Sequence, residues 1–119
     1  MPFLNDLKIT PLSDGKRWMV LDEFKYYSPL IRECISIPKG FVTDFASIPR
    51  LPLTWIVGSP ATGKYRRAAV VHDYLYFKKE TDRDICDKVF REAMEEDNTP
   101  SWKKNIVYSA VRLFGKFYY

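Results

Sequence analysis

The sequence predicts an α+β domain: a small N-terminal antiparallel β-sheet, a long ordered loop and three C-terminal α-helices. Three observations favour this order. Short β-prone runs separated by turn residues fill the first third of the chain, prolines crowd the next part, and the remainder has helical periodicity. The 119 residues, 46% of them hydrophobic, are expected to form a single domain over residues 1–119 with one core.

The β-prone runs are residues 5–10, 17–25 and 33–37, which read NDLKIT, RWMVLDEFK and ECISI. Turn signals at residues 13–15 and around Ser28 separate them, which favours antiparallel neighbours. From residue 37 the chain reads IPKGFVTDFASIPRLPLTW. Its three prolines and one glycine favour an extended loop over a regular element, and such loops often carry functional residues.

The helical half contains three segments. Residues 65–78 are apolar on nearly every side, which is typical of a central, buried helix. A second helix is expected after TDRD, where Thr81 would cap the helix and Asp84 would complete an acidic capping box. At helical spacing, one wide arc of this helix is apolar, and Asp87 lies at the edge of that arc. The arc consists of Ile85, Cys86, Val89, Phe90, Ala93 and Met94.

A third helix is expected after Pro100, with a broad apolar face and a basic rim. The simpler interpretation is a helix docked on the core with solvated cations around it. The alternative is a helix that contacts an anionic lipid surface. The apolar face consists of Trp102, Ile106, Val107, Ala110, Val111, Phe114 and Phe117.

Charge and cysteine content exclude few classes of protein. The net charge of +4 is mild and suits an anionic partner without requiring one, and the dispersed basic residues form no clear nucleic-acid motif. Cys34 and Cys86 do not make a disulfide framework, so both are expected to be reduced and buried. The N-terminal MPFLNDLKIT has no signal-peptide pattern, and no run approaches the roughly 20 apolar residues of a membrane span. Synthesis in a cytoplasm is therefore expected.

The stretch AAVVHDYLYF, residues 68–77, places the single histidine beside an aspartate in an apolar helix. Removing either side chain from water is costly unless each finds a partner. A zinc protease site needs two histidines on one helix, and a structural zinc site needs a Cys/His cluster, so neither is expected. Two interpretations remain open: His72 is a general base, or His72 is a hydrogen-bonded core residue.

Helix geometry indicates that the two side chains have separate partners, because Asp73 points about 100° away from His72. A basic imidazole needs a carboxylate on its far nitrogen, and Asp87 on the next helix is the best candidate. Asp73 is then left to pair with Asp44, Arg50 or a cation. Calcium would suit Asp73 if loop carbonyls and a second carboxylate completed its coordination.

This arrangement resembles the phospholipase A2 superfamily, on the residues HDYLY (72–76) and CDKVF (86–90). The resemblance implies that His72 activates a water, that Asp73 holds calcium, that Asp87 orients His72 and that Tyr76 supports the network. Asp44, in KGFVTDFASIPR, would be the second calcium carboxylate.

A second resemblance covers residues 38–115. The order GFVTDFASIPR, AAVVHDYLY, CDKVFREAM and YSAVRLFG is similar to a small, largely uncharacterised domain family of tailed phages and prophages. The resemblance implies a phage origin. Synthesis in the cytoplasm of a bacterial host is then expected, and association with the virion is left open. Its signature positions are Thr43, Asp44, Ser47, Pro49, Arg50, His72, Asp73, Tyr76 and Asp87.

Two classes of function therefore remain open. The first is a calcium-dependent hydrolase that acts on a lipid or another ester at the host envelope. The second is a non-enzymatic tail or head-associated virion component, or a small phage effector, with a structural His-Asp network. Within the first class, Ser47 is an alternative nucleophile, although FASIP lacks a Gly-x-Ser-x-Gly elbow. Arg50 is expected to bind a phosphate or to brace Asp44 or Asp73.

Overall fold

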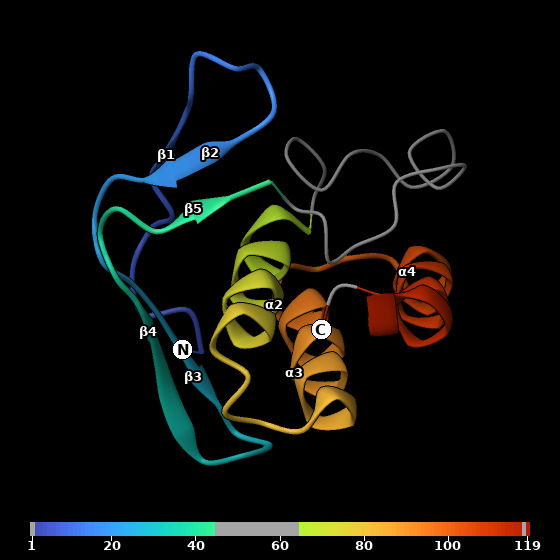
Figure 1. Cartoon of the computed structure of the whole chain (residues 1–119). Helices are drawn as coiled ribbons and strands as arrows, with labels where there is room; N and C mark the ends of the chain where they lie inside the picture. The colour runs from blue at the N-terminus through green and yellow to red at the C-terminus, as the bar shows by residue number, and fades with distance from the viewer. Residues whose placement is uncertain (1, 45–64, 118) are drawn as a thin grey trace.

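A computed structural model describes residues 2–44, 65–117 and 119 (Figure 1). The strands of this part precede its three α-helices, so the predicted α+β class and the order of its elements are confirmed. The strands are β1 (Ile9–Pro11), β2 (Trp18–Val20), β3 (Phe24–Ser28), β4 (Glu33–Ile37) and β5 (Val42–Thr43). The helices are α2 (Arg66–Lys78), α3 (Arg83–Glu96), α4 (Ser101–Phe114) and the short 3-10 helix η1 (Gly115–Phe117).

The strands form two antiparallel sheets: a three-stranded sheet in the order β1-β2-β5 and a β3-β4 hairpin. The run at residues 17–25, predicted as a single β segment, is divided between these sheets. It is divided because residues 21–23 are exposed and lie outside any strand, which allows β3 to pair with β4 instead. In the first sheet Ile9 lies opposite Val20, and in the hairpin Phe24 lies opposite Ile37.

The N-terminal run forms a strand only from Ile9, because Asn5 is used differently. Its side chain accepts a hydrogen bond from the Lys25 amide at 2.9 Å and donates one to the Glu23 carbonyl at 2.7 Å. The side chain of Asn5 thus forms the hydrogen bonds to the backbone at this edge of β3. A neighbouring strand would have formed them with its backbone N–H and C=O groups.

Part of the predicted loop is a strand. Gly40 has a φ of +92°, a conformation that favours glycine, and the turn there returns the chain to β2. Val42 and Thr43 then pair with Met19 and Trp18. Residues 45–64, which include most of the predicted loop, lie outside the described residues.

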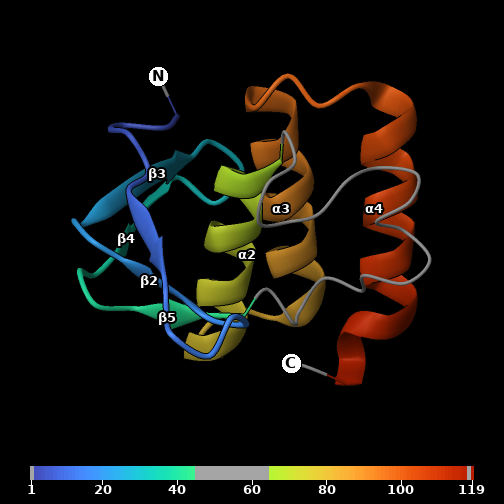
Figure 2. The same ribbon diagram turned by 90° about the horizontal axis from the view of Figure 1, so that it is seen from above.

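The helices follow one another away from the sheets. In Figure 2 the strands lie to one side of α2, while α3 and then α4 lie on its other side. The three helices confirm the predicted segments, but the predicted capping box is wrong. Asp82 is the N-cap residue of α3 and makes no side-chain cap bond, so Thr81 lies one residue too early to cap the helix. Among the described helices, none is long and apolar enough to cross a membrane.

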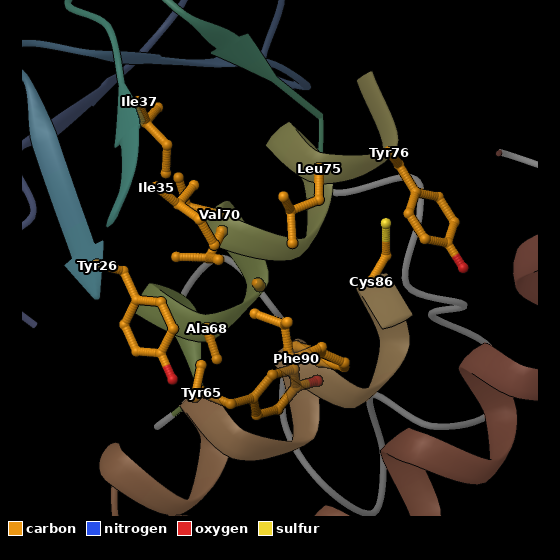
Figure 3. Close-up of a cluster of buried hydrophobic side chains, with 14 of the residues drawn as sticks. Tyr26, Ile35, Ile37, Tyr65, Ala68, Val70, Leu75, Tyr76, Cys86 and Phe90 are labelled. Carbon is orange, nitrogen blue, oxygen red and sulfur yellow. The ribbon is translucent and has the colours of Figure 1, made fainter. Parts of the chain in front are cut away.

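One hydrophobic core joins the two halves of the domain (Figure 3). Most of its members come from the β3-β4 hairpin, from α2 and from α3, while Val20 adds β2 and Val107 and Val111 add α4. Residues of the expected α4 face at its two ends depart from the prediction, since Trp102 is 52% exposed and Phe114 is 51% exposed. The face of α4 that meets the core is therefore narrower than the apolar arc in the sequence. The labelled side chains of Figure 3 are Tyr26, Ile35, Ile37, Tyr65, Ala68, Val70, Leu75, Tyr76, Cys86 and Phe90.

The two cysteines are free and differ in burial. Cys86 is buried as expected, and its burial raises the pKa of its thiol to about 12. The expectation that Cys34 is also buried is wrong. Side chains alternate along β4, and because Ile35 and Ile37 face the core, Cys34 faces outward.

Glu92 of α3 fixes the hairpin to the helices. Its carboxylate accepts hydrogen bonds from the Tyr26 hydroxyl at 2.6 Å, the Ser28 hydroxyl at 2.8 Å and the Leu30 amide at 2.9 Å. Tyr26 and Ser28 are fully buried. Burial and then the bond to Glu92 raise the pKa of Tyr26, so its phenol stays a hydrogen-bond donor. The end of β3 is therefore held by charge-assisted hydrogen bonds as well as by apolar packing.

Candidate functional site

The histidine of α2 and an aspartate of α3 meet in the interior. Nε2 of His72 lies 2.8 Å from Oδ1 of Asp87, and both side chains are fully buried. Tyr76, one helical turn after His72, donates its hydroxyl to the same Oδ1 at 2.6 Å. The three residues predicted as a catalytic group therefore lie together. Asp87 was expected at the edge of an apolar arc, and it is fully buried there.

Hydrogen bonding keeps Asp87 ionised despite its burial. Burial raises the pKa of this carboxyl, but the hydrogen bonds from His72, Tyr76 and Arg112 outweigh it, so the pKa lies below its usual value. An ionised carboxylate can only accept hydrogen bonds, so Nε2 of His72 is the donor and carries the proton. The lone pair of the neutral ring is then on Nδ1. Burial and the bond to Asp87 also raise the pKa of Tyr76, which keeps its phenol protonated.

Aromatic rings restrict the orientation of the imidazole. The ring centroid of His72 lies 4.2 Å from that of Tyr76 and 4.7 Å from that of Phe90. Figure 3 shows both aromatic side chains, with Tyr76 at the edge of the cluster and its hydroxyl directed away from Leu75. His72 is thus positioned by packing and by a hydrogen bond, which is the support that a precise polar site needs.

Two arginines that the sequence did not single out complete the site. Nη1 of Arg112, in the last turn of α4, donates to Oδ2 of Asp87 at 2.6 Å. Nε of Arg83 lies 3.9 Å from the same oxygen, while its Nη2 donates to the carbonyls of Val111 and Arg112. The spacing of Arg83 four residues before Asp87 was a signal for such a pair. No periodic pattern pointed to Arg112, which looked like one of the cations on the rim of α4.

Gly115 gives the Tyr76 hydroxyl its space. A Cβ atom at this position would lie 2.6 Å from the Tyr76 hydroxyl oxygen, which is closer than the two atoms can approach. A glycine directly after α4 therefore allows the C-terminal end of the helix to pack on the ring of Tyr76. In the sequence, Gly115 ends the motif YSAVRLFG, and nothing there indicates this role.

Asp73 lies in a second polar group, as helix geometry predicted. The Thr43 hydroxyl of β5 donates a hydrogen bond to Oδ2 of Asp73, which joins the three-stranded sheet to α2. Asp44 follows Thr43 directly and is exposed. Ser47 and Arg50, the other predicted binding residues, lie outside the described residues. Within residues 2–44, 65–117 and 119, no three His, Cys, Asp or Glu side chains are grouped so that they could hold one metal ion.

Together, these elements define a small α+β fold whose three helices share a network of the buried His72, Tyr76 and Asp87 with the partly exposed Arg112. The chain belongs to the family described as Protein of unknown function (DUF1353), whose model matches residues 18–111. That span contains His72, Tyr76 and Asp87 as well as the Thr43-Asp73 pair, and it ends one residue before Arg112. The prediction of an uncharacterised domain family is thereby confirmed.

The chain is also similar to the uncharacterized protein y4jT of Sinorhizobium fredii, with 35% identity over 80 residues. The match covers 66% of this chain and 23% of that relative, so the chain corresponds to less than a quarter of the longer protein. No solved structure matches the chain.

Proposed function

We propose that the chain is a phage-encoded hydrolase of a lipid or another ester, phospholipase A2-like, in which His72 is the general base. One observation carries the proposal: Nε2 of His72 is hydrogen-bonded to a buried, ionised Asp87 that also accepts the Tyr76 hydroxyl. This pairing fixes the proton on Nε2 and stabilises the imidazolium that a base catalyst forms. Asp87 and Tyr76 are the residues that orient the base.

In the proposed reaction, Nδ1 of His72 removes a proton from a water molecule as the water oxygen attacks the ester carbonyl carbon. The resulting tetrahedral intermediate breaks its bond to the leaving alcohol oxygen. That oxygen takes the proton from Nδ1, which releases an alcohol and a carboxylic acid and returns His72 to its neutral form. Asp87 stays ionised throughout and balances the positive charge on the ring.

The proposal also assigns calcium to Asp73 and Asp44. Carboxylate oxygens are the type of ligand that calcium prefers, but a calcium ion takes 6–8 oxygen ligands. In the described part of the chain, no three Asp, Glu, His or Cys side chains are grouped so that they could hold one metal ion. Backbone carbonyls, water and substrate would have to supply the rest. Bound calcium would polarise the ester carbonyl. Thr43 would hold Asp73 in place, and Ser47 and Arg50 stay predicted binding residues outside the described part.

The test is hydrolysis of fluorescent phosphatidylglycerol vesicles and of soluble esters in millimolar calcium, by the wild type and by His72→Gln. Glutamine keeps a donor for Asp87 but has no basic nitrogen, so we expect a loss of about 10²- to 10⁴-fold in rate. Arg91→Gln, which changes an exposed residue of α3 outside the network, is the matched control and should retain the wild-type activity. The melting temperature of each variant shows whether it is folded.

Two results would overturn the hydrolase proposal: no hydrolysis of any of these esters by the wild type, or full activity of a folded His72→Gln variant. Calorimetric titration tests the calcium assignment separately, with Asp73→Asn as the control. Absence of a heat of binding at millimolar calcium would overturn the calcium assignment. The role of His72 as a base would then be tested by the activity assay alone.

The burial of the network favours a second candidate function. His72 and Asp87 are both fully buried, and their contacts join α2, α3 and α4, which is also what a purely structural network would do. The chain would then be a non-enzymatic tail or head-associated virion component, or a small effector, made in the cytoplasm of a bacterial host. Its partners would be other virion proteins or an anionic lipid surface.

Mass spectrometry of purified phage particles tests this candidate. After induction of a strain that carries the gene in a prophage, we expect peptides of the chain to co-purify with particles through a density gradient. A capsid protein is the positive control, and an abundant host enzyme of similar size is the negative control. Peptides found only in the host lysate would exclude a virion component and leave the effector.

A further inference from the structure

We infer that Arg112 is a positioning residue for the His72-Asp87 pair, an inference that rests on the proposed role of His72 as a base. The two oxygens of Asp87 have different partners. Oδ1 accepts the two donors of α2, His72 and Tyr76, whereas Oδ2 accepts Nη1 of Arg112 at 2.6 Å. Arg112 thus holds Oδ2 of the carboxylate while Oδ1 accepts the hydrogen bond from Nε2 of His72.

Arg83 does not duplicate this contact. Its Nε is 3.9 Å from Oδ2, beyond hydrogen-bond distance, and its Nη2 is committed to the backbone carbonyls of Val111 and Arg112. Arg83 therefore holds the end of α4 near α3. Because this contact fixes the backbone of Arg112, it also places the Arg112 side chain where it can reach Asp87.

Arg112 also helps the buried carboxylate to keep its charge, together with the hydrogen bonds from His72 and Tyr76. Asp87 is fully buried, while the Arg112 side chain is 37% exposed, so the guanidinium extends from the surface to the buried oxygen. An opposite charge at 2.6 Å favours the ionised carboxylate. If Arg112 is removed, Asp87 can rotate or take up a proton, and either change weakens the hydrogen bond that fixes the proton of His72 on Nε2.

Because the chain has a single histidine, the effect of Arg112 on the imidazole tautomer can be measured without a substrate. In protein labelled with 15N-histidine, long-range 1H-15N spectra at neutral pH report the tautomer of one imidazole only. We expect the wild type to show the Nε2-H form alone. Arg112→Gln should show a mixture of the two tautomers, and Arg112→Lys should restore the Nε2-H form. Arg91→Gln, which removes an exposed arginine of α3 that lies over the Tyr108 ring, should leave the spectrum unchanged.

An unchanged Nε2-H form in folded Arg112→Gln would overturn the inference. If Arg112→Gln does not fold, Arg112→Met decides: a mixture of the two tautomers supports positioning by Arg112, and an unchanged Nε2-H form overturns it. If Arg112→Gln shows the tautomer mixture but the wild type hydrolyses no ester, the positioning role of Arg112 is supported and only the hydrolase proposal is overturned. Where hydrolysis is measurable, we expect Arg112→Gln to lower kcat about tenfold or more with KM nearly unchanged.

Discussion

Replacing Asp87 with alanine is expected to lower the free energy of unfolding by about 3–5 kcal/mol, because it leaves buried donors and a guanidinium without their shared acceptor. The carboxylate accepts hydrogen bonds at 2.6–2.8 Å from His72, Tyr76 and Arg112, which lie on two other helices. Urea unfolding followed by circular dichroism measures the loss. Asp84→Ala, in the same turn of α3 but exposed, should cost less than about 1 kcal/mol.

The loss should also depend on pH. Because the pKa of Asp87 is lowered in the folded state, its contribution is fully present above its pKa in the unfolded chain. The contribution disappears as the pH falls through the lower pKa of the folded state. The difference in stability between wild type and Asp87→Ala should therefore be largest near neutral pH and shrink in acid. A difference that stays constant from neutral pH to about pH 2 would contradict an ionised Asp87.

The second large effect is expected at Glu92. Glu92→Ala removes the shared acceptor of Tyr26, Ser28 and the Leu30 amide, so it should lower the free energy of unfolding by about 2–4 kcal/mol. Glu95→Ala is the matched control on the same helix. Glu95 is exposed and pairs with Lys104 at 2.9 Å, and its loss should cost less than about 1 kcal/mol.

Hydrogen exchange can locate the effect of Glu92→Ala. We expect amides of the β3-β4 hairpin, such as those of Tyr26 and Ile35, to exchange faster relative to amides in the middle of α2. Equal acceleration in both places would indicate a global loss of stability without a specific release of the hairpin. A stability equal to that of Glu95→Ala would show that the three hydrogen bonds contribute little.

The helices were predictable from the sequence because helical periodicity is a local signal. Apolar residues at intervals of three and four predict the three helices and put His72 and Tyr76 on one face. The same geometry separates His72 from Asp73, and the structure shows Asp73 bound to Thr43 instead. The meeting of His72 with Asp87 was also predictable, because two ionisable groups in apolar helical faces need partners.

Contacts that depend on packing between distant segments were not predictable. The sequence shows nothing that would direct the Asn5 side chain to the backbone beside β3, or Arg112 to a carboxylate on another helix. The outward direction of Cys34 depends on the register of β4, which is set by Ile35 and Ile37 facing the core. The prediction that both cysteines are buried was based on composition alone. Composition does not indicate which side chains of a strand face the core.

The attachment of the hairpin by Glu92 has a consequence for the order in which the chain folds. Glu92 is 62–66 residues away in sequence from the groups it accepts hydrogen bonds from, whereas β3 and β4 are neighbours along the chain. A ribosome therefore releases both strands of the hairpin well before it has made α3. Until then, the hydroxyls of Tyr26 and Ser28 are hydrogen-bonded to water, and the end of β3 lacks the helix that fixes it. The three hydrogen bonds that fix the end of β3 therefore form only after α3 has been made, and forming them closes a loop of 62–66 residues, which costs conformational entropy that the local β3-β4 contacts do not.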